Sequence, residues 1–210
     1  LWWRSVGSTH TAHSTEHMLD IVARETGRDP LEMRLAMLGK YPRHAAALKL
    51  AAEAAGWGKP LPAGRFMGLA VHESFKSFVA QVAEIETKPD GGFKVVRVVC
   101  AVDCGLAVNP DVVKAQIEGG IGFGLGAALK SAITLKKGAV EQANFDTYDV
   151  LRMSEMPRVE VLIVPSDQPP TGVGEPGVPP ITPAVANALL AASGVRTVAL
   201  PMTRQTYRKA

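Results

Sequence analysis

Through the first part of the chain, apolar residues recur at the spacing of amphipathic helices. Residues 14–27 open on Ser14, a candidate N-cap, carry apolar side chains along one helical face and close on a glycine. A second helix is predicted after Asp29, because a capping carboxylate followed by proline is a typical helix start. Residues 42–56 predict a third helix that a glycine ends.

The pattern then changes to that of strands. A Gly- and Pro-rich crossover at 56–64 precedes strand patterns at 66–72, 78–87 and 93–103. A Lys-Pro-Asp-Gly-Gly turn separates the last two of these segments, which predicts an antiparallel hairpin.

The remainder of the chain mixes both patterns. Asn109-Pro110-Asp111 caps a predicted helix, residues 132–142 resemble a second hairpin, and residues 159–165 resemble another strand. A final helix is expected to start at Thr182-Pro183.

This order of elements predicts the α+β class, with mixed and antiparallel strands flanked by helices. We expect a helical N-terminal segment over residues 1–56 and an α+β part over residues 57–210. At 210 residues, the chain is long enough for one large domain or two small ones.

The composition is that of an ordinary globular protein, with 47% hydrophobic residues, 20% charged residues and a net charge of +3. This charge is too small to indicate a nucleic-acid partner, and no basic run is interleaved with aromatic residues. The sequence has no run of about 18 uninterrupted apolar residues, so it predicts no membrane-spanning helix. The chain starts Leu-Trp-Trp-Arg, without Met or a signal-like segment, which favours a processed or excised piece.

Histidine and cysteine side chains give little support for a metal site. His10, His13 and His17 have helical spacing, but the helix start predicted at Ser14 lies between them, and no carboxylate-plus-His motif accompanies them. Cys100-Ala-Val-Asp-Cys104 has no second cysteine pair to complete a metal site. We expect both cysteines to be small residues of the core.

Residues 171–180, Thr-Gly-Val-Gly-Glu-Pro-Gly-Val-Pro-Pro, place a single carboxylate, Glu175, among glycines and prolines. Prolines fix φ, and glycines let other groups approach the backbone closely, so the loop is expected to be stiff and accessible. Two interpretations stay open: a solvated surface carboxylate, or an ionisable group held for chemistry.

Residues 116–129 contain five glycines, each of which costs a helix roughly 1 kcal/mol relative to alanine. Gly122-x-Gly124-x-x-Ala127 superficially fits a dinucleotide fingerprint. It follows helical sequence instead of a strand, and no acidic residue follows at the expected distance of about 20 residues, which disfavours an NAD-binding oxidoreductase. Two explanations remain: close packing against a neighbouring element, or backbone lying against a flat or phosphate-bearing cofactor.

Four stretches, at 4–8, 102–110, 116–129 and 172–189, occur in an order that resembles a known family. They resemble the C-terminal part of the molybdenum-binding catalytic subunit of the xanthine dehydrogenase and aldehyde oxidase family. Residues 144–157 make the resemblance closest to the branch of bacterial isoquinoline 1-oxidoreductase beta subunits and membrane-associated aldehyde dehydrogenases. The resemblance covers nearly the whole chain.

In that family, the glutamate of a Gly-x-Gly-Glu-Pro loop is the catalytic base beside molybdenum, and Glu175 matches it. The resemblance implies hydroxylation of an aldehyde or N-heteroaromatic carbon with oxygen from water, in which a rigidly held base removes a proton. It implies no direct side-chain ligand to the metal. The residues that it assigns to molybdopterin binding are Arg4, Ser5, Gly7, Ser8, Gln116, Gly119, Gly120, Gly172 and Gly174.

The substrate side departs from the xanthine dehydrogenases. Arg4 matches their substrate-side arginine, but Ser5 and Val6 stand where they have Gly and Phe, which argues against xanthine as the substrate. Phe145 and Tyr148 are candidates for lining a substrate funnel, with packing in the core as the alternative.

A complete catalytic subunit of this family is several times longer, so the chain should supply part of the site and be inactive alone. The implied cofactor is molybdopterin cytosine dinucleotide with molybdenum. Implied partners are the rest of the catalytic subunit, a small subunit with two-iron, two-sulfur (2Fe-2S) clusters and a cytochrome c, at a periplasmic or inner-membrane-associated location. The alternative is a non-catalytic structural or assembly module that retains the fold.

Overall fold

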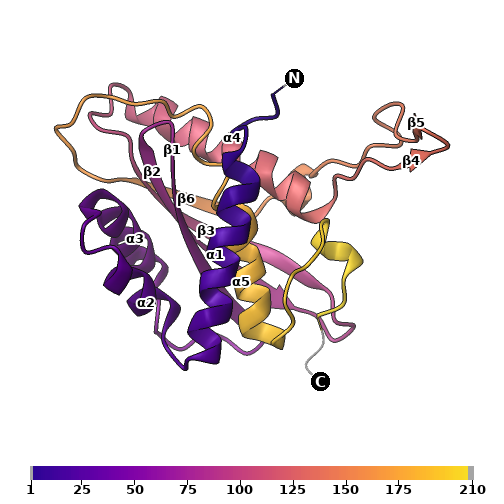
Figure 1. The fold of residues 1–210 in the computed structure, drawn as a ribbon, viewed down its shortest axis with the longest axis horizontal. Coiled ribbons are helices and arrows are strands. Elements are labelled where there is room, and N and C mark those ends of the chain that lie inside the picture. Colours follow the sequence, from indigo (N-terminus) through magenta and orange to yellow (C-terminus); the bar gives the residue numbers. More distant parts are fainter. Residues whose placement is uncertain (1, 208–210) are drawn as a thin grey trace.

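The computed structural model describes residues 2–207 and shows a four-stranded sheet with helices on both faces (Figure 1). The expected α+β class is confirmed. In chain order, the elements are α1 (Ser8–Glu25), α2 (Pro30–Met37), α3 (Pro42–Ala55), β1 (Arg65–Ser74), β2 (Ser77–Thr87), β3 (Phe93–Asp103), α4 (Pro110–Leu129), β4 (Leu135–Lys136), β5 (Ala139–Val140), the 3-10 turn Met153–Glu155, β6 (Arg158–Ile163), α5 (Ile181–Ser193) and the 3-10 turn Met202–Arg204.

The sheet has the strand order β1-β2-β3-β6. Strand β2 pairs antiparallel with both β1 and β3, which confirms the predicted hairpin, whereas β6 lies parallel to β3. Both faces of the sheet are covered, so β3 reads as a continuous apolar run instead of an alternating one.

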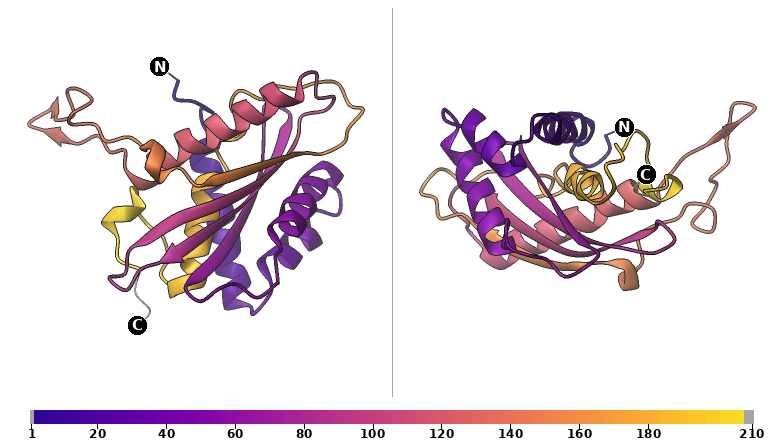
Figure 2. Two further views of the ribbon diagram at one scale, coloured as in Figure 1. Left: turned by 180° about the vertical axis from the view of Figure 1, so that it is seen from behind. Right: turned by 90° about the horizontal axis from the view of Figure 1, so that it is seen from below.

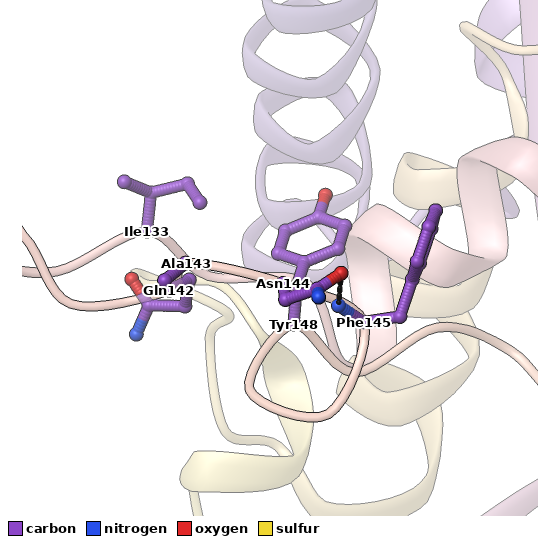
Figure 3. Close-up of a pocket in the computed structure, with 6 residues that line it drawn as sticks. All are labelled: Ile133, Gln142, Ala143, Asn144, Phe145 and Tyr148. Atoms are coloured by element: carbon purple, nitrogen blue, oxygen red, sulfur yellow. Dashed lines mark hydrogen bonds between the residues drawn. The ribbon is translucent and has the colours of Figure 1, made fainter.

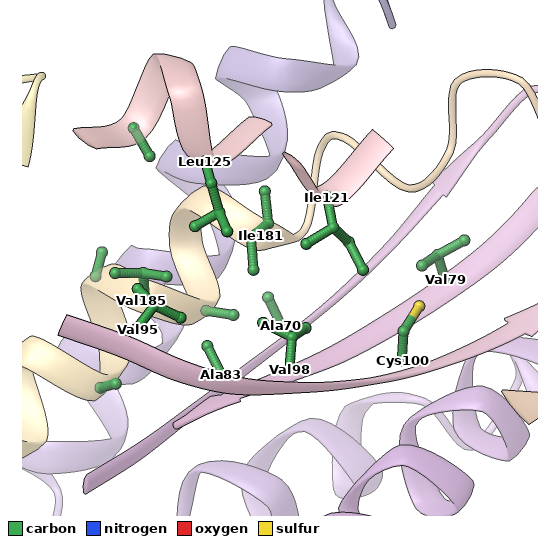
Figure 4. Close-up of a cluster of buried hydrophobic side chains, with 14 of the residues drawn as sticks. Ala70, Val79, Ala83, Val95, Val98, Cys100, Ile121, Leu125, Ile181 and Val185 are labelled. Carbon is green, nitrogen blue, oxygen red and sulfur yellow. The ribbon is translucent and has the colours of Figure 1, made fainter. Parts of the chain in front are cut away.

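Two apolar clusters lie on opposite faces of the sheet. On one face, side chains of α4 and α5, among them Ile121, Leu125 and Ile181, pack on Val98 and Cys100 (Figure 4). On the other face, α3 covers the alternate strand residues. Helix α1 lies against α5, so it packs outside the first of these layers (Figures 1 and 2). The division at residue 56 stays a prediction, and α3 shares its core with the strands that follow.

Several helix ends follow from local chemistry, as predicted. Asp29 Oδ1 accepts hydrogen bonds from the N–H groups of Leu31 and Glu32, at 2.8 and 3.0 Å, and begins α2. Asn109 caps α4 in the same way. Helix α3 ends at Gly56, whose φ of 78° is the left-handed conformation that glycine adopts readily.

The predicted start of the first helix at Ser14 is wrong. Helix α1 begins at Ser8, and Ser14 lies inside it, where its Oγ donates to the His10 carbonyl at 2.7 Å. The helix follows directly on a tight turn, and no side chain caps it, so its start leaves no capping signature. Helix α5 likewise begins at Ile181, ahead of the predicted start at Thr182-Pro183.

Cys100 and Cys104 are free and buried, as predicted. Within residues 2–207, no helix combines the length and apolar character needed to cross a membrane. The predicted second hairpin, β4–β5, forms the tip of an arm of residues 130–152 that projects from the body of the molecule (Figure 1).

A buried cluster of charges ties α1 to α2 and to the sheet. Arg34 Nε donates to Glu16 Oε2 at 2.8 Å, and Arg34 Nη1 lies 2.6 Å from Asp20 Oδ1 without the alignment of a hydrogen bond. Glu16 Oε2 also accepts the N–H of Val71 at 2.9 Å. All three charged residues are at most 5% exposed, so the single guanidinium of Arg34, and not solvent, is the counter-charge of the two carboxylates.

Candidate active site

Two segments 170 residues apart meet at Glu175. The Ser5 N–H donates to Glu175 Oε1 at 3.0 Å, and the Ser5 hydroxyl donates to the Glu175 backbone carbonyl at 2.7 Å. Glu175 is half-buried, and no group of residues 2–207 donates a hydrogen bond to its Oε2. One carboxylate oxygen is therefore held while the other is available.

The stem of the Glu175 loop is fixed to the sheet. The Thr171 N–H donates to the Cys104 carbonyl at 2.9 Å, and the Ser77 hydroxyl donates to the Gly172 carbonyl at 2.7 Å. A side chain at Gly105 would overlap the Gln168 and Pro169 carbonyls, so only glycine lets this stem pass so close.

The other side of the loop is anchored from within the core. Gln81, fully buried in β2, donates from Nε2 to the Gly177 carbonyl at 2.9 Å. The Val178 N–H closes a turn onto the Glu175 carbonyl at 3.0 Å. Glu175 is thus carried by a loop that is fixed on both sides, in agreement with the expected stiffness.

Arg4 joins this loop to α4. Its Nε donates to the Gly174 carbonyl at 2.8 Å, and its Nη2 donates to Gly174 as well and to Gln116 Oε1 at 3.2 Å. The guanidinium lies over the Phe123 ring, 5.7 Å from its centre. Three of the four stretches that carried the family resemblance therefore converge on one place, because Arg4, Gln116 and Gly174 belong to different stretches.

The fourth stretch, residues 102–110, holds the stem of the Glu175 loop through the Cys104 carbonyl. Asp103 accepts both Arg43 Nε at 2.7 Å and Arg43 Nη2 at 2.6 Å, and also the Gly105 N–H at 3.0 Å. Burial alone would raise the pKa of Asp103, but these hydrogen bonds outweigh it and lower the pKa below its ordinary value. An ionised Asp103 thereby holds the turn at residues 103–105, and the Cys104 carbonyl of this turn accepts the Thr171 N–H at the stem of the Glu175 loop.

The glycines of α4 divide between the two explanations that the sequence left open. A Cβ at Gly120 would lie 3.2 Å from Gly177 Cα, and one at Gly124 would overlap Ile181, so both glycines serve close packing against the segment after Glu175. Gly119 has no atom within 4 Å of such a Cβ, and a Cβ at Gly122 would meet only Met156. Gly119 faces open space on the other side of the helix, and Gly122 borders the same space with only Met156 against it.

That open space is a pair of adjoining cavities beside α4, which share Gly122, Phe123 and Leu151. The larger, of about 440 Å³, is lined by Ala115, Glu118, Gly119, Gly122, Phe123, Leu151, Arg152, Met153 and Met156. The smaller is lined by Trp3, Gly122, Phe123, Gly126, Ala127, Ser131, Tyr148, Val150 and Leu151. The Trp3 and Phe123 rings pack with their centres 4.5 Å apart and their planes tilted by 39°, beside the Arg4 guanidinium.

The other predicted residues lie around this site. Gly7 and Ser8 open α1, and the Ser8 N–H donates to the Ser5 carbonyl at 3.0 Å. Gly172 and Gly174 are exposed on the Glu175 loop, and Gly174 has open space beside its Cα. Their assignments to a cofactor stay predictions.

Phe145 and Tyr148 lie on the arm, apart from the loop that carries Glu175. Figure 3 shows both rings on the same side of the arm loop, with the Asn144 side chain accepting the Phe145 N–H at 2.8 Å. Phe145 is 84% exposed, so the alternative of core packing is wrong for this residue. Tyr148 is half-buried and borders both the cavity of Figure 3 and the smaller cavity beside α4.

The histidines of α1 take part in packing. His17 Nε2 accepts the Thr197 N–H at 3.0 Å, so its Nδ1 carries the proton and donates to Asn187 Oδ1 at 2.8 Å. His13 stacks on His17. Its burial is the larger cause, and the nearby His17 the smaller, of a His13 pKa lowered to about 4. Across residues 2–207, no three His, Cys, Asp or Glu side chains form a metal-binding group.

Sequence inspection missed Ser77 and Gln81, which anchor the Glu175 loop. Gln81 carried a signal, because it is a lone amide within an apolar strand pattern. Ser77 carried none, since its partners lie some 95 residues away along the chain.

Residues 15–157 match the family model of the molybdopterin cofactor-binding domain, and the chain belongs to that family. It is 37% identical over 205 residues to the isoquinoline 1-oxidoreductase subunit beta of Brevundimonas diminuta, with 96% of this chain and 26% of that protein covered. It is 32% identical over 221 residues to a membrane-bound aldehyde dehydrogenase (pyrroloquinoline-quinone) of Gluconacetobacter polyoxogenes, with 96% and 29% covered. The resemblance drawn from the four stretches is confirmed.

The fold is also similar to that of the aldehyde oxidoreductase from Desulfovibrio gigas, with a TM-score of 0.73 over 95% of this chain and 40% of that one. At 13% identity, this likeness shows the fold alone. The chain spans less than a third of the length of both curated relatives. Glu175 lies outside the residues that the family model matches.

The residues around α4 fit a molybdopterin. Gly119 leaves the helix backbone open to the larger cavity, and a Cβ at Gly122 would press on Met156 Sδ at 3.3 Å and narrow it. Arg152 lines that cavity and offers guanidinium donors to a phosphate-bearing group, and Gln116 stands one helical turn before Gly119 and Gly120 on α4.

Proposed function

We propose that this chain is the C-terminal molybdopterin-binding part of the catalytic subunit of a molybdenum hydroxylase-type oxidoreductase, in which Glu175 is the catalytic base. One observation carries the proposal: Arg4 and Ser5 hydrogen-bond Gln116 of α4 and the Glu175 loop, so that three distant segments form a single half-exposed site. The substrate class is an aldehyde or N-heteroaromatic compound, as the printed names of the relatives suggest.

The reaction needs a base with a fixed position and a free oxygen. Ser5 holds Glu175 Oε1, so Oε2 is the atom that accepts the proton from the water-derived oxygen as that oxygen attacks the substrate carbon. When bound, the molybdenum cofactor accepts the electron pair that leaves the substrate. The anchored loop keeps the carboxylate in place without reorganisation, which is how a positioned base gains its effectiveness.

Arg4 has a holding role in this arrangement. Its Nε and Nη2 already donate to Gly174 and Gln116, so most of its donors keep the loop against α4. Gln116 precedes Gly119 by one turn of α4, Gly119 lines the larger cavity on the cofactor side, and Tyr148 lines the smaller cavity from the arm.

The finer assignments complete the proposal. The cofactor is molybdopterin cytosine dinucleotide, and electrons pass to a 2Fe-2S subunit and onward to a cytochrome c. The rest of the catalytic subunit completes the site, and the enzyme is periplasmic or associated with the inner membrane. The name of one relative, an oxidoreductase subunit, supports further subunits, and that of the other, a membrane-bound dehydrogenase, supports the membrane location. The cytosine form, the 2Fe-2S subunit and the cytochrome c rest on the family resemblance alone.

The test is Glu175→Gln in the full-length enzyme, assembled with its other subunits. Loss of a positioned base should lower kcat by roughly 10²-fold or more, while molybdenum content stays that of the wild type. Glu53→Gln is the matched control, because Glu53 is exposed on α3 and charge is removed there too. If Glu175→Gln turned over within a few-fold of wild type, the chain would be better described as a structural or assembly module.

A further inference from the structure

We propose that Ser5 is a positioning residue for Glu175: its hydroxyl group fixes the backbone of the Glu175 loop while its N–H directs the carboxylate. This inference rests on the proposed function, since it concerns how the base is held. It goes further by giving a role to Ser5, which stands where the xanthine dehydrogenases have glycine.

The backbone of Ser5 explains why glycine would suit this position. Ser5 has a φ of 73° and Val6 a φ of 51°, so two successive residues with side chains adopt the left-handed region. This conformation is unfavourable for residues other than glycine, and most of all for a β-branched residue such as Val6. A structure that keeps it must offset the strain by specific contacts.

The long-range hydrogen bonds of Ser5 all lead to Glu175. Ser5 is fully buried, so its hydroxyl is shielded from solvent. The hydroxyl donates to the Glu175 carbonyl, which also accepts the Val178 N–H, and the Ser5 N–H donates to Glu175 Oε1. Ser5 therefore hydrogen-bonds both the main chain and the side chain of Glu175.

Substitution of Ser5 can remove the hydrogen bond of its hydroxyl and keep that of its N–H. Ser5→Gly keeps the N–H and tolerates positive φ, but it removes the hydroxyl and frees the turn. Ser5→Ala removes the hydroxyl and leaves a Cβ in the strained conformation. If the hydroxyl positions the loop, both variants should show the same defect, and strain alone cannot explain the glycine variant.

Both variants should be measured in the full-length enzyme. We expect faster hydrogen–deuterium exchange in residues 172–178, a kcat about tenfold lower and unchanged KM and molybdenum content, because displacing a base affects the chemical step and not binding. Thr11→Ala is the control, since Thr11 Oγ1 also donates to a carbonyl, that of Gly7 at 2.9 Å, but not to the Glu175 loop.

The outcomes distinguish this inference from the proposed function. Wild-type exchange in residues 172–178, or faster exchange with wild-type kcat, would overturn the role of Ser5 and leave the role of Glu175 to its own test. Faster exchange, a lower kcat and unchanged KM in both variants, but not in Thr11→Ala, would establish it. A rise in KM or a loss of molybdenum in Ser5→Gly would instead mark Ser5 as a binding residue and overturn the inference.

Discussion

Glu16 and Glu175 are held in similar ways but in different surroundings. In each, one side-chain oxygen accepts a backbone N–H and the backbone carbonyl accepts a side-chain donor from a distant residue. Glu16 is 4% exposed and pairs with Arg34, whereas Glu175 is half-buried and is held by the uncharged groups of Ser5.

This difference is the one that the proposed function requires between a structural carboxylate and a catalytic base. Glu16 is paired with the guanidinium of Arg34 and is almost fully shielded from solvent, so no substrate can reach it. Glu175 keeps an oxygen that no group of residues 2–207 hydrogen-bonds, while its position is still fixed. The predictions below break one side of this comparison at a time.

The largest effect is expected at Arg34. Arg34→Met would leave Glu16 and Asp20 buried without their counter-charge, which should lower the free energy of unfolding by about 3–5 kcal/mol. Urea unfolding of the chain measures this loss. A loss under 1 kcal/mol would show that the cluster is not the tie between α1 and α2.

A second effect tests the packed side of α4. Gly124→Ala would place a Cβ against the branched side chain of Ile181 and 3.0 Å from the Val178 carbonyl, so we expect a loss of about 3 kcal/mol. Thermal unfolding measures it. An unchanged melting temperature would mean that α4 and the segment after Glu175 are not closely packed.

A third effect concerns pH. Burial raises the pKa of Asp20 from 3.8 to about 6, against the opposing pull of Arg34. Between these values the folded state binds more protons than the unfolded state, so the free energy of unfolding should fall as pH rises from about 4 to about 6, by on the order of 2 kcal/mol. Asp20→Asn should remove this part of the pH dependence, and an identical profile for both proteins would refute the assignment.

The smallest effect is expected on the open side of α4. Gly119→Ala meets no atom, so the greater helix propensity of alanine should stabilise the chain by up to about 1 kcal/mol. The comparison depends on changes of opposite sign in the free energy of unfolding, a gain for Gly119→Ala and a loss for Gly124→Ala. Equal destabilisation by both substitutions, again measured by thermal unfolding, would contradict the division of the helix into a packed and an open face.

Much of the fold could be predicted because its signals are local. Asp29 and Asn109 cap their helices with their own side chains, and Gly56 ends α3 in the conformation that only glycine adopts freely. The start of α1 could not be predicted, because its N-cap, Gly7, has no side chain to cap with, and the residues of positive φ before it, Ser5 and Val6, are not glycine. The pairing of β6 with β3 was also beyond local patterns, since it depends on the crossover through α4.

The site was predictable only in part. Glu175 stood out as the sole carboxylate of a stiff loop, and the family resemblance gave it a role. What positions it did not stand out, because Ser5 reaches it over 170 residues and Gln81 reaches its loop over 96. Contacts of this kind are set by how the sheet and α5 pack, not by any short stretch of sequence.

The most direct test of the account is the molybdenum content of the protein purified from its native host without separation from its partners, measured by elemental analysis together with release of the pterin. The account predicts molybdenum and pterin in stoichiometric amounts with the chain. Absence of both from preparations that retain the partner subunits would contradict it, and Glu175 would then be an ordinary carboxylate on a rigid loop.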